Sequence, residues 1–160
     1  MKETLEKLKL DDKYINDIYI NNNQEWCIVW DTNSYKTSFP SQMFDEHMKQ
    51  AKNENKRILS IAFNNNGQHI ILTHDKFFCS EDEQGDFLHK AYELYGLPLS
   101  ISLTTTSMVV CCENGVYTKG IPQEITTIIN ENINFRKVIR FSNNGVCLLT
   151  DGLRIFTHNL

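Results

Sequence analysis

The chain lacks the long uniform stretches that mark membrane proteins and nucleic-acid-binding proteins. None of its apolar runs approaches the ~20 residues needed to cross a bilayer. It has no run of lysine and arginine, and its formal net charge is −4 at pH 7, whereas nucleic-acid-binding surfaces are usually basic. The first residues, Met-Lys-Glu-Thr-Leu-Glu, do not form the apolar core of a signal peptide. We therefore expect an acidic, cytoplasmic protein that binds neither membranes nor nucleic acid.

Cysteine is scarce, and its spacing does not suit a metal site. The five cysteines are an odd number and contain no Cys-x-x-Cys pair; they are Cys27, Cys79, Cys111, Cys112 and Cys147. Most lie inside apolar runs, and the adjacent Cys111 and Cys112 would point to opposite faces of a strand. A structural zinc site normally needs paired ligands at short spacing. We predict reduced thiols that pack as small apolar side chains, with no metal and no other cofactor.

The clearest positive feature of the sequence is a short pattern of residues that recurs about every 40 residues. Each copy alternates apolar residues and then turns polar; the copies are Ile18–Asn23, Ile61–Asn66, Ile101–Thr106 and Ile139–Asn144. A period of this length is typical of supersecondary units that are stacked in a row or arranged around an axis. The sequence therefore predicts a repeat protein.

Each repeat reads as three short strands and one helix. The alternation of apolar and other residues in this pattern predicts a half-buried strand, and the Asn-rich or Thr-rich segment after it predicts a hairpin turn. A run that is apolar on both faces, such as 69–72, predicts a central strand, and a second turn leads to a third strand. The helices show apolar residues at i, i+4 and i+7, as in Phe44, Met48 and Ala51. We predict an α+β repeat fold in one domain, residues 1–160, with units of about 1–39, 40–80, 81–120 and 121–160.

The order of the elements favours a closed ring over an open stack. A helix is expected near residues 3–10, before the first strands, and the last strand near Thr157 has no helix after it. A propeller-like ring about a pseudo-fourfold axis would bring that first helix beside the last strands, with Leu5 and Leu8 packed near Phe141 and Phe156. An open repeat stack is the alternative, and its ends would normally be polar caps. The first helix is polar enough to be such a cap, but the segment 153–156 is no more polar than the matching segments of the other units.

Several residues also match a family pattern. The matches are Ile58, Ile61, Phe63 and Gly67; Trp26 and Ile28; Gly115 and Tyr117; and Ile121 and Pro122. On these residues the chain resembles small β-propeller-like bacterial tandem-repeat proteins, whose units read Ile-x-x-Ile-x-Phe, Gly-x-Trp-x-Ile, Gly-Tyr and Ile-Pro before a helix. The resemblance covers nearly the whole chain, with the matches scattered over different copies. It implies a propeller-like architecture with binding surfaces, and it names no activity.

The first unit breaks the symmetry of the repeat with three aromatic residues, Trp26, Trp30 and Tyr35. Aromatic residues are the usual hot spots of protein interfaces. We expect Trp26 to be a core residue. Trp30 stands where the other units carry polar residues, namely Thr73, an acidic or Asn position near Glu113, and Asp151. An aromatic residue at such a position predicts an exposed contact.

Histidine offers the other candidate chemistry. His69 and His74 lie in or beside the second strand of the second unit, next to Asp75, and histidine with a carboxylate can serve as a general base or a metal ligand. However, His69 takes the repeat position of Trp26 and Cys147, which indicates a structural residue. The sequence also contains no Gly-x-Ser-x-Gly motif for a nucleophile.

Two hypotheses of function remain. The first is a non-enzymatic protein-binding module, inhibitor-like or immunity-like, that binds a partner protein through one face. Its candidate binding residues are Trp30, Trp26, Tyr35, His69 and His74. The alternative is a small-ligand-binding protein or enzyme with a site at the pseudo-symmetry axis. Catalysis needs unlike residues that converge, and the axis of similar repeats offers mostly apolar ones, so we favour the binding module.

Overall fold

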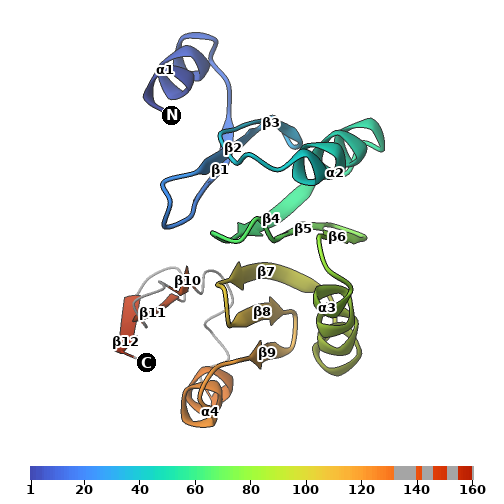
Figure 1. The fold of residues 1–160 in the computed structure, drawn as a ribbon, viewed down its shortest axis with the longest axis vertical. Helices are drawn as coiled ribbons and strands as arrows, with labels where there is room; N and C mark the ends of the chain where they lie inside the picture. The colour runs from blue at the N-terminus through green and yellow to red at the C-terminus, as the bar shows by residue number, and fades with distance from the viewer. Residues whose placement is uncertain (132–139, 142–145, 151–154, 160) are drawn as a thin grey trace.

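The computed structural model of the chain describes residues 1–131, 140–141, 146–150 and 155–159 (Figure 1). Within these residues the fold is α+β, with four helices that each precede three strands. The helices are α1 (Lys2–Leu10), α2 (Gln42–Asn53), α3 (Asp82–Tyr95) and α4 (Gln123–Glu131). Parts of the expected fourth unit, namely Ile139 and the segments 142–144 and 151–154, lie outside the described residues.

The strands form four separate antiparallel sheets of three strands, and each sheet follows chain order with the second strand in the middle. The first two sheets are β1 (Ile15–Ile20), β2 (Trp26–Trp30), β3 (Ser34–Thr37) and β4 (Ile58–Phe63), β5 (His69–Thr73), β6 (Phe77–Cys79). The other two are β7 (Pro98–Leu103), β8 (Met108–Cys112), β9 (Gly115–Lys119) and β10 (Arg140–Phe141), β11 (Val146–Thr150), β12 (Ile155–Asn159). The units are therefore hairpin-connected, because consecutive strands in each one pair directly.

The first three units share local details that go beyond their strand order. The pairing register shifts at the second residue of β1, β4 and β7, so each first strand carries a β-bulge at the same place. In each of these units the backbone N–H of the residue after the second strand also donates a hydrogen bond to the backbone carbonyl of the residue before the first strand. These bonds are Asp31 to Tyr14, His74 to Arg57 and Glu113 to Leu97, at 3.1, 3.2 and 3.1 Å. The repeated helix-plus-three-strand unit expected from the sequence is present in these three units.

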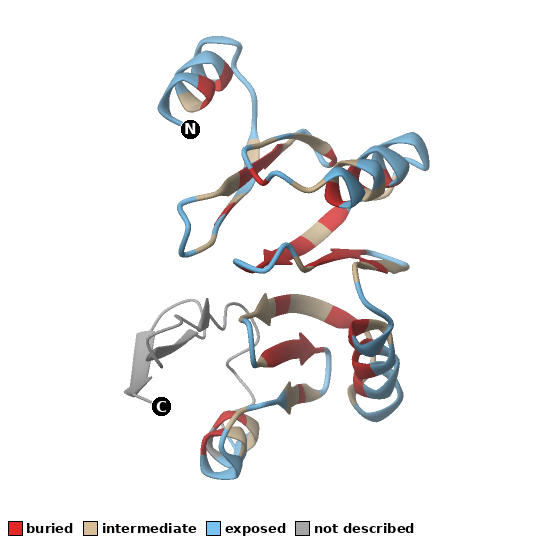
Figure 2. Ribbon diagram, viewed as in Figure 1, coloured by how far each residue is buried: buried red, intermediate tan, exposed pale blue. Residues whose placement is uncertain are grey.

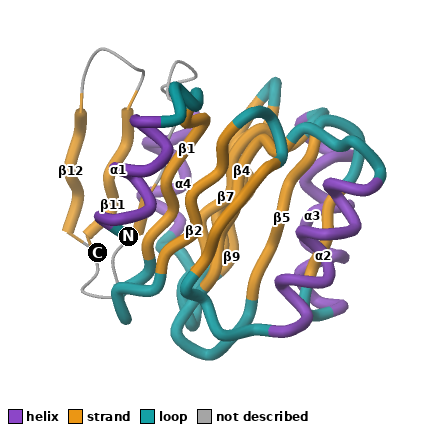
Figure 3. Tube along the Cα trace, turned by 90° about the horizontal axis from the view of Figure 1, so that it is seen from above, coloured by secondary structure: helices purple, strands orange, loops and turns teal. Residues whose placement is uncertain are grey.

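The central strands β5 and β8 are buried along their whole length because each has a packed layer on both faces (Figure 2). In β5, Ile71 faces the core shared with the first sheet and α2. Ile70 and Leu72 face the core shared with α3 and the third sheet. In β8 the adjacent Cys111 and Cys112 likewise enter different cores, as their spacing predicts. Viewed at right angles, α2 and α3 lie together along one side of the strands (Figure 3).

The helices bury matching positions counted from their N-caps. The N-caps of α1, α2 and α3 are Met1, Ser41 and Glu81. Three residues after each cap lie the buried Thr4, Phe44 and Gln84, and seven residues after it lie the buried Leu8, Met48 and Leu88. The helix before the first sheet therefore has the buried stripe of its siblings. Its expected partners Phe141 and Phe156 have side chains outside the described part of the chain.

Among the residues that the structure describes, none of the helices is both long and apolar enough to cross a membrane.

Candidate functional site

In the first three units, one edge of the molecule collects the ends of the helices and the second turns. In each of these units the chain leaves a helix and enters a first strand, and the start of that strand pairs with the end of the second strand. The pairs are Ile15 with Trp30, Ile58 with Thr73 and Pro98 with Cys112. We call this surface the helix-exit rim; it comprises residues 10–16, 30–34, 53–58, 73–76, 92–98 and 112–115, and lies at the upper edge of the view in Figure 3.

The rim is continuous from the first unit to the third. The Ile58 N–H of the second unit donates to the Thr32 carbonyl of the first, at 3.2 Å. A cavity links the second and third units, because Thr73, Leu97 and Pro98 all line it. A partner resting on this edge would therefore meet side chains from several units.

Most of the exposed large apolar side chains lie on this rim. Seven such side chains occur in the described part of the chain, and four of them belong to the rim. These four are Leu10, Tyr14, Tyr92 and Leu94, with 86%, 74%, 56% and 56% of their surface exposed. The other three lie at the opposite ends of elements: Met1 just before α1, Ile20 at the end of β1 and Met43 in the first turn of α2.

Trp30 lies on the rim at the end of β2 and is half-buried. Its structural equivalents Thr73 and Cys112 are small and only 2% and 1% exposed. The expectation of an acidic or Asn equivalent near Glu113 was wrong, because Met108 pairs with Leu103 and the register then places Cys112 opposite Pro98. The first turn of the third unit is one residue shorter than that of the second. The residue equivalent to Thr73 is therefore Cys112, one position earlier than Glu113.

Tyr35 and Trp30 lie on opposite faces of the first sheet. The turn before Tyr35 is one residue longer than the equivalent turn of the second unit, and each added residue moves the following side chains to the other face of the sheet. Trp30 pairs with Ser34 across a three-residue turn, whereas the equivalent turn of the second unit has two residues. Tyr35 therefore pairs with Val29 and points at α2, where its hydroxyl donates to Asp45 Oδ1 at 2.5 Å. Burial, and then the Asp45 carboxylate, raise the pKa of Tyr35. Tyr35 thus joins the first sheet to α2.

The longer turn also holds a backbone conformation that is rare for its residues. Asp31 and Thr32 have φ values of 47° and 81°, and a β-branched residue seldom adopts a positive φ. Thr32 is held on both sides, because its N–H donates to Asn16 Oδ1 at 3.1 Å and its carbonyl accepts from Ile58. The neighbouring Lys13 forms an ion pair with Asp31 at 2.8 Å. The backbone around Trp30 is therefore well anchored.

Trp26 shares a sheet face with Trp30 but lies at the opposite end of β2, beside the half-exposed Ile20. The two indoles start from positions four residues apart, or about 13 Å along an extended strand. Trp26 is half-buried, whereas its equivalent His69 is fully buried beneath α2. At the helix position of His47, α1 carries Lys7, which offers no ring to cover Trp26.

His69 lies in the core, paired with another histidine. Its Nε2 is 2.9 Å from His47 Nδ1, and its own Nδ1 has no hydrogen-bond partner among the described residues. Burial lowers the pKa of His69 to about 4, with a further contribution from His47 and partial opposition from the Gly67 backbone. In the next unit the two positions are the apolar Phe87 and Met108. The two histidines therefore occupy positions at which the third unit has two apolar residues.

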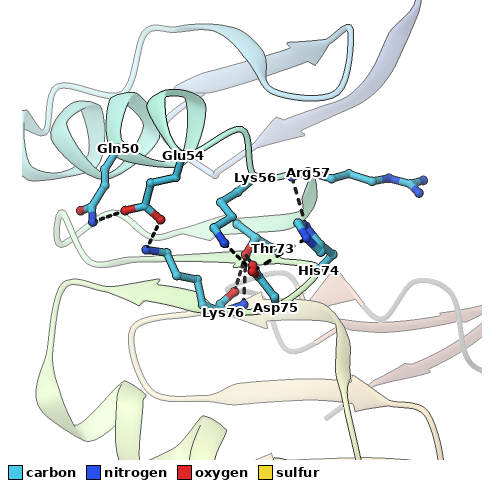
Figure 4. A network of polar contacts seen from close by, with 8 residues as sticks. All are labelled: Gln50, Glu54, Lys56, Arg57, Thr73, His74, Asp75 and Lys76. Atoms are coloured by element: carbon cyan, nitrogen blue, oxygen red, sulfur yellow. Dashed lines mark hydrogen bonds and ion pairs between the residues drawn. The ribbon is translucent and has the colours of Figure 1, made fainter.

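His74 lies on the rim, in a network of ion pairs and hydrogen bonds (Figure 4). Lys56 and Thr73 both contact the carboxylate of Asp75, and His74 Nε2 is 3.8 Å from it. Lys76 binds Glu54 at 2.5 Å, which ties the β5–β6 turn to the end of α2. The side chain of Arg57 extends away from this network (Figure 4). The structure therefore separates His74 from His69.

The four described cysteines are poor nucleophiles. Burial raises the pKa of Cys27, Cys79 and Cys112 to about 12 and that of Cys111 to about 11, which keeps the thiols protonated. None of the four forms a disulfide bond with another described residue. The side chain of Cys147 lies outside the described residues. In the part of the chain that the structure describes, no three His, Cys, Asp or Glu side chains gather to hold a metal ion.

The sequence reasoning missed a cavity of about 190 Å³ on the rim between the second and third units. Its lining comes from both units and from α3: Leu72, Thr73, Asp75, Lys76, Phe77, His89, Tyr92, Leu97 and Pro98. A cavity between units depends on contacts far apart in the chain, so strand and helix periodicity cannot reveal it. The one local signal was the exposed Tyr92 on α3.

No protein-family model, curated protein or solved structure matches the chain.

Proposed function

We propose that the protein is a non-enzymatic binding module that holds a partner protein against its helix-exit rim. The observation that carries this proposal is the concentration of four of the seven exposed large apolar side chains on that rim. Exposed large apolar side chains that gather on one surface are characteristic of protein interaction sites. Trp30 adds an aromatic ring of the kind that dominates binding energies, on a backbone held by neighbouring hydrogen bonds.

The charges near the first unit indicate the chemistry of the partner. Asp11 and Asp12 are exposed beside Leu10 and Tyr14, and Lys13 is engaged by Asp31. This end of the rim is therefore acidic around an apolar centre, which complements a basic partner surface with an apolar centre of its own. An inhibitor-like or immunity-like protein that covers a basic functional site has this character. The four described cysteines form no disulfide bond with one another, which supports a cytoplasmic location.

We further propose that the four units close into a propeller-like ring about a pseudo-fourfold axis, with an open stack as the alternative. The support is the bulge and the backbone hydrogen bond after the second strand that the first three units share, and the buried stripe of α1 at the positions of its siblings. In a ring, α1 lies between the last sheet and the first. NMR contacts between the methyl groups of Leu5 or Leu8 and those of Leu148 would support closure; contacts to the first sheet alone would exclude it.

The binding proposal is tested by capture followed by quantitative binding. A tagged chain is used to isolate a partner from its native cells, and the dissociation constant of the purified pair is then measured. Two double variants are compared, Leu10→Ser with Tyr14→Ser on the rim, and Ile20→Ser with Met43→Ser away from it. Each pair removes exposed apolar surface, so both variants should fold normally. We expect only the rim variant to lose affinity, by tenfold or more, or about 1.4 kcal/mol. Equal affinity in both variants would contradict the proposal.

A further inference from the structure

The cavity between the second and third units has an aromatic lining that the proposed binding mode leaves unexplained. Phe77 lies against His89 with ring centroids 4.9 Å apart, and Tyr92 follows one turn later on α3. Leu72, Leu97 and Pro98 complete the apolar part of the lining. Tyr92 keeps 56% of its surface exposed, so part of its ring is open to a further packing contact at the edge of the cavity.

The charged groups of the lining are already paired within the chain. The carboxylate of Asp75 accepts from Lys56 and Thr73, and the ammonium group of Lys76 binds Glu54 at 2.5 Å. A charged occupant would have to displace one of these partners, which costs the hydrogen bonds they make. The cavity is therefore complementary in charge to a neutral group.

From this lining we infer that the cavity receives a neutral aromatic side chain from the partner protein. This inference rests on the proposed function, because the cavity lies on the same rim, and it adds the chemistry of one anchor. The ring would pack on Tyr92 and Phe77, with Leu97 and Pro98 beneath it. Aromatic anchors that enter small pockets are the usual centres of interface energy.

The test uses the full chain and single-residue probes, so it does not need the partner. N-acetyl-L-tryptophanamide and N-acetyl-L-phenylalaninamide are titrated into labelled protein, and the NMR signals of Leu72, Phe77 and Leu97 are followed. N-acetyl-L-alaninamide and N-acetyl-L-lysinamide serve as the small and the charged controls. We expect saturable shifts at these residues with the aromatic probes alone. Shifts with every probe, or none at the cavity, would overturn the inference.

A matched pair of tyrosine variants locates the effect. Tyr92→Ala removes the cavity wall, and Tyr14→Ala removes an exposed tyrosine at the other end of the rim. We expect Tyr92→Ala to weaken probe binding by about three- to tenfold, as for the loss of one aromatic contact, and Tyr14→Ala to leave it unchanged. Equal behaviour of the two variants would overturn the inference. If an isolated partner loses affinity with the Leu10 and Tyr14 double variant but not with Tyr92→Ala, the cavity assignment fails while the binding function stands.

Discussion

At the scale of single residues, the buried histidine pair should make stability depend on pH. Burial lowers the pKa of both His47 and His69, the latter from 6.5 to about 4, and the neighbouring Glu46 partly opposes the shift of His47. The unfolded chain therefore binds more protons than the folded chain between pH 6.5 and pH 4, so stability falls as the pH falls through this range. We expect thermal unfolding experiments to show a loss of about 2 kcal/mol between pH 7 and pH 4.

The third unit supplies a matched control for that prediction. Changing His47→Phe together with His69→Met installs the residues found at the same positions there, Phe87 and Met108. The double variant should lose most of the dependence between pH 6.5 and pH 4 and should remain at least as stable at pH 7, because a buried unpartnered nitrogen disappears. An unchanged pH dependence would assign the effect to other groups.

The two tryptophans should separate binding from folding. Trp30→Ala is expected to weaken partner binding by about 2 kcal/mol with little loss of stability, because its siblings at that position are small residues. Trp26→Ala is expected to leave binding unchanged, since Trp26 lies at the opposite end of β2, and to lower the unfolding free energy by about 2 kcal/mol, because its equivalents His69 and Met108 are large, buried side chains. Calorimetry of unfolding and of binding measures both effects, and the reverse result would contradict these roles.

At the scale of elements, the first helix offers two leucines in contrasting surroundings. Leu8 is 6% exposed and Leu10 is 86% exposed, in the same nine-residue helix. Leu8→Ala should lower the unfolding free energy by about 2 kcal/mol, as for a lost buried contact. Leu10→Ala should change it very little. If denaturant titrations give equal midpoints for the two variants, α1 does not pack on the rest of the molecule.

The turn after β2 should be improved by glycine. Thr32 has a φ of 81°, which costs a β-branched residue free energy but costs glycine almost none. The hydrogen bonds at this position use the backbone, so Thr32→Gly retains them. We expect a gain of about 1 kcal/mol in unfolding free energy. Thr105→Gly is the control, because this exposed turn residue has no positive φ and glycine should bring no gain there.

At the scale of the whole molecule, ring closure predicts coupling between the two ends of the chain. Deletion of residues 1–10 removes the buried Thr4 and Leu8. In a ring, hydrogen exchange should then accelerate both in β2 and in β11, because α1 would contact the sheets on both sides. In an open stack the acceleration would stay in the first unit, since the repeats of a stack contact only their neighbours. Hydrogen exchange of the full chain and of the deletion variant separates the two.

The sequence by itself determined the repeat, the alternation of strands and helices, and the two-sided burial of the central strands. These properties depend on local periodicity, such as the spacing of Phe44, Met48 and Ala51, and on turn residues that act within a few positions. The buried cysteines were predictable for the same reason, since Cys111 and Cys112 belong to an apolar strand. The sequence also singled out Trp30, because the other units have no aromatic residue at the equivalent position.

Only the tertiary structure decided which side chains share a surface. One additional turn residue before Tyr35 turned that ring toward α2, and one residue fewer in the third unit placed Cys112 opposite Pro98. The contact between His47 and His69 joins the helix and the sheet of one unit, and the cavity beside Tyr92 joins two units. A strand changes face with every residue, so turn length decides such contacts, and packing between units depends on pairs that no local pattern connects.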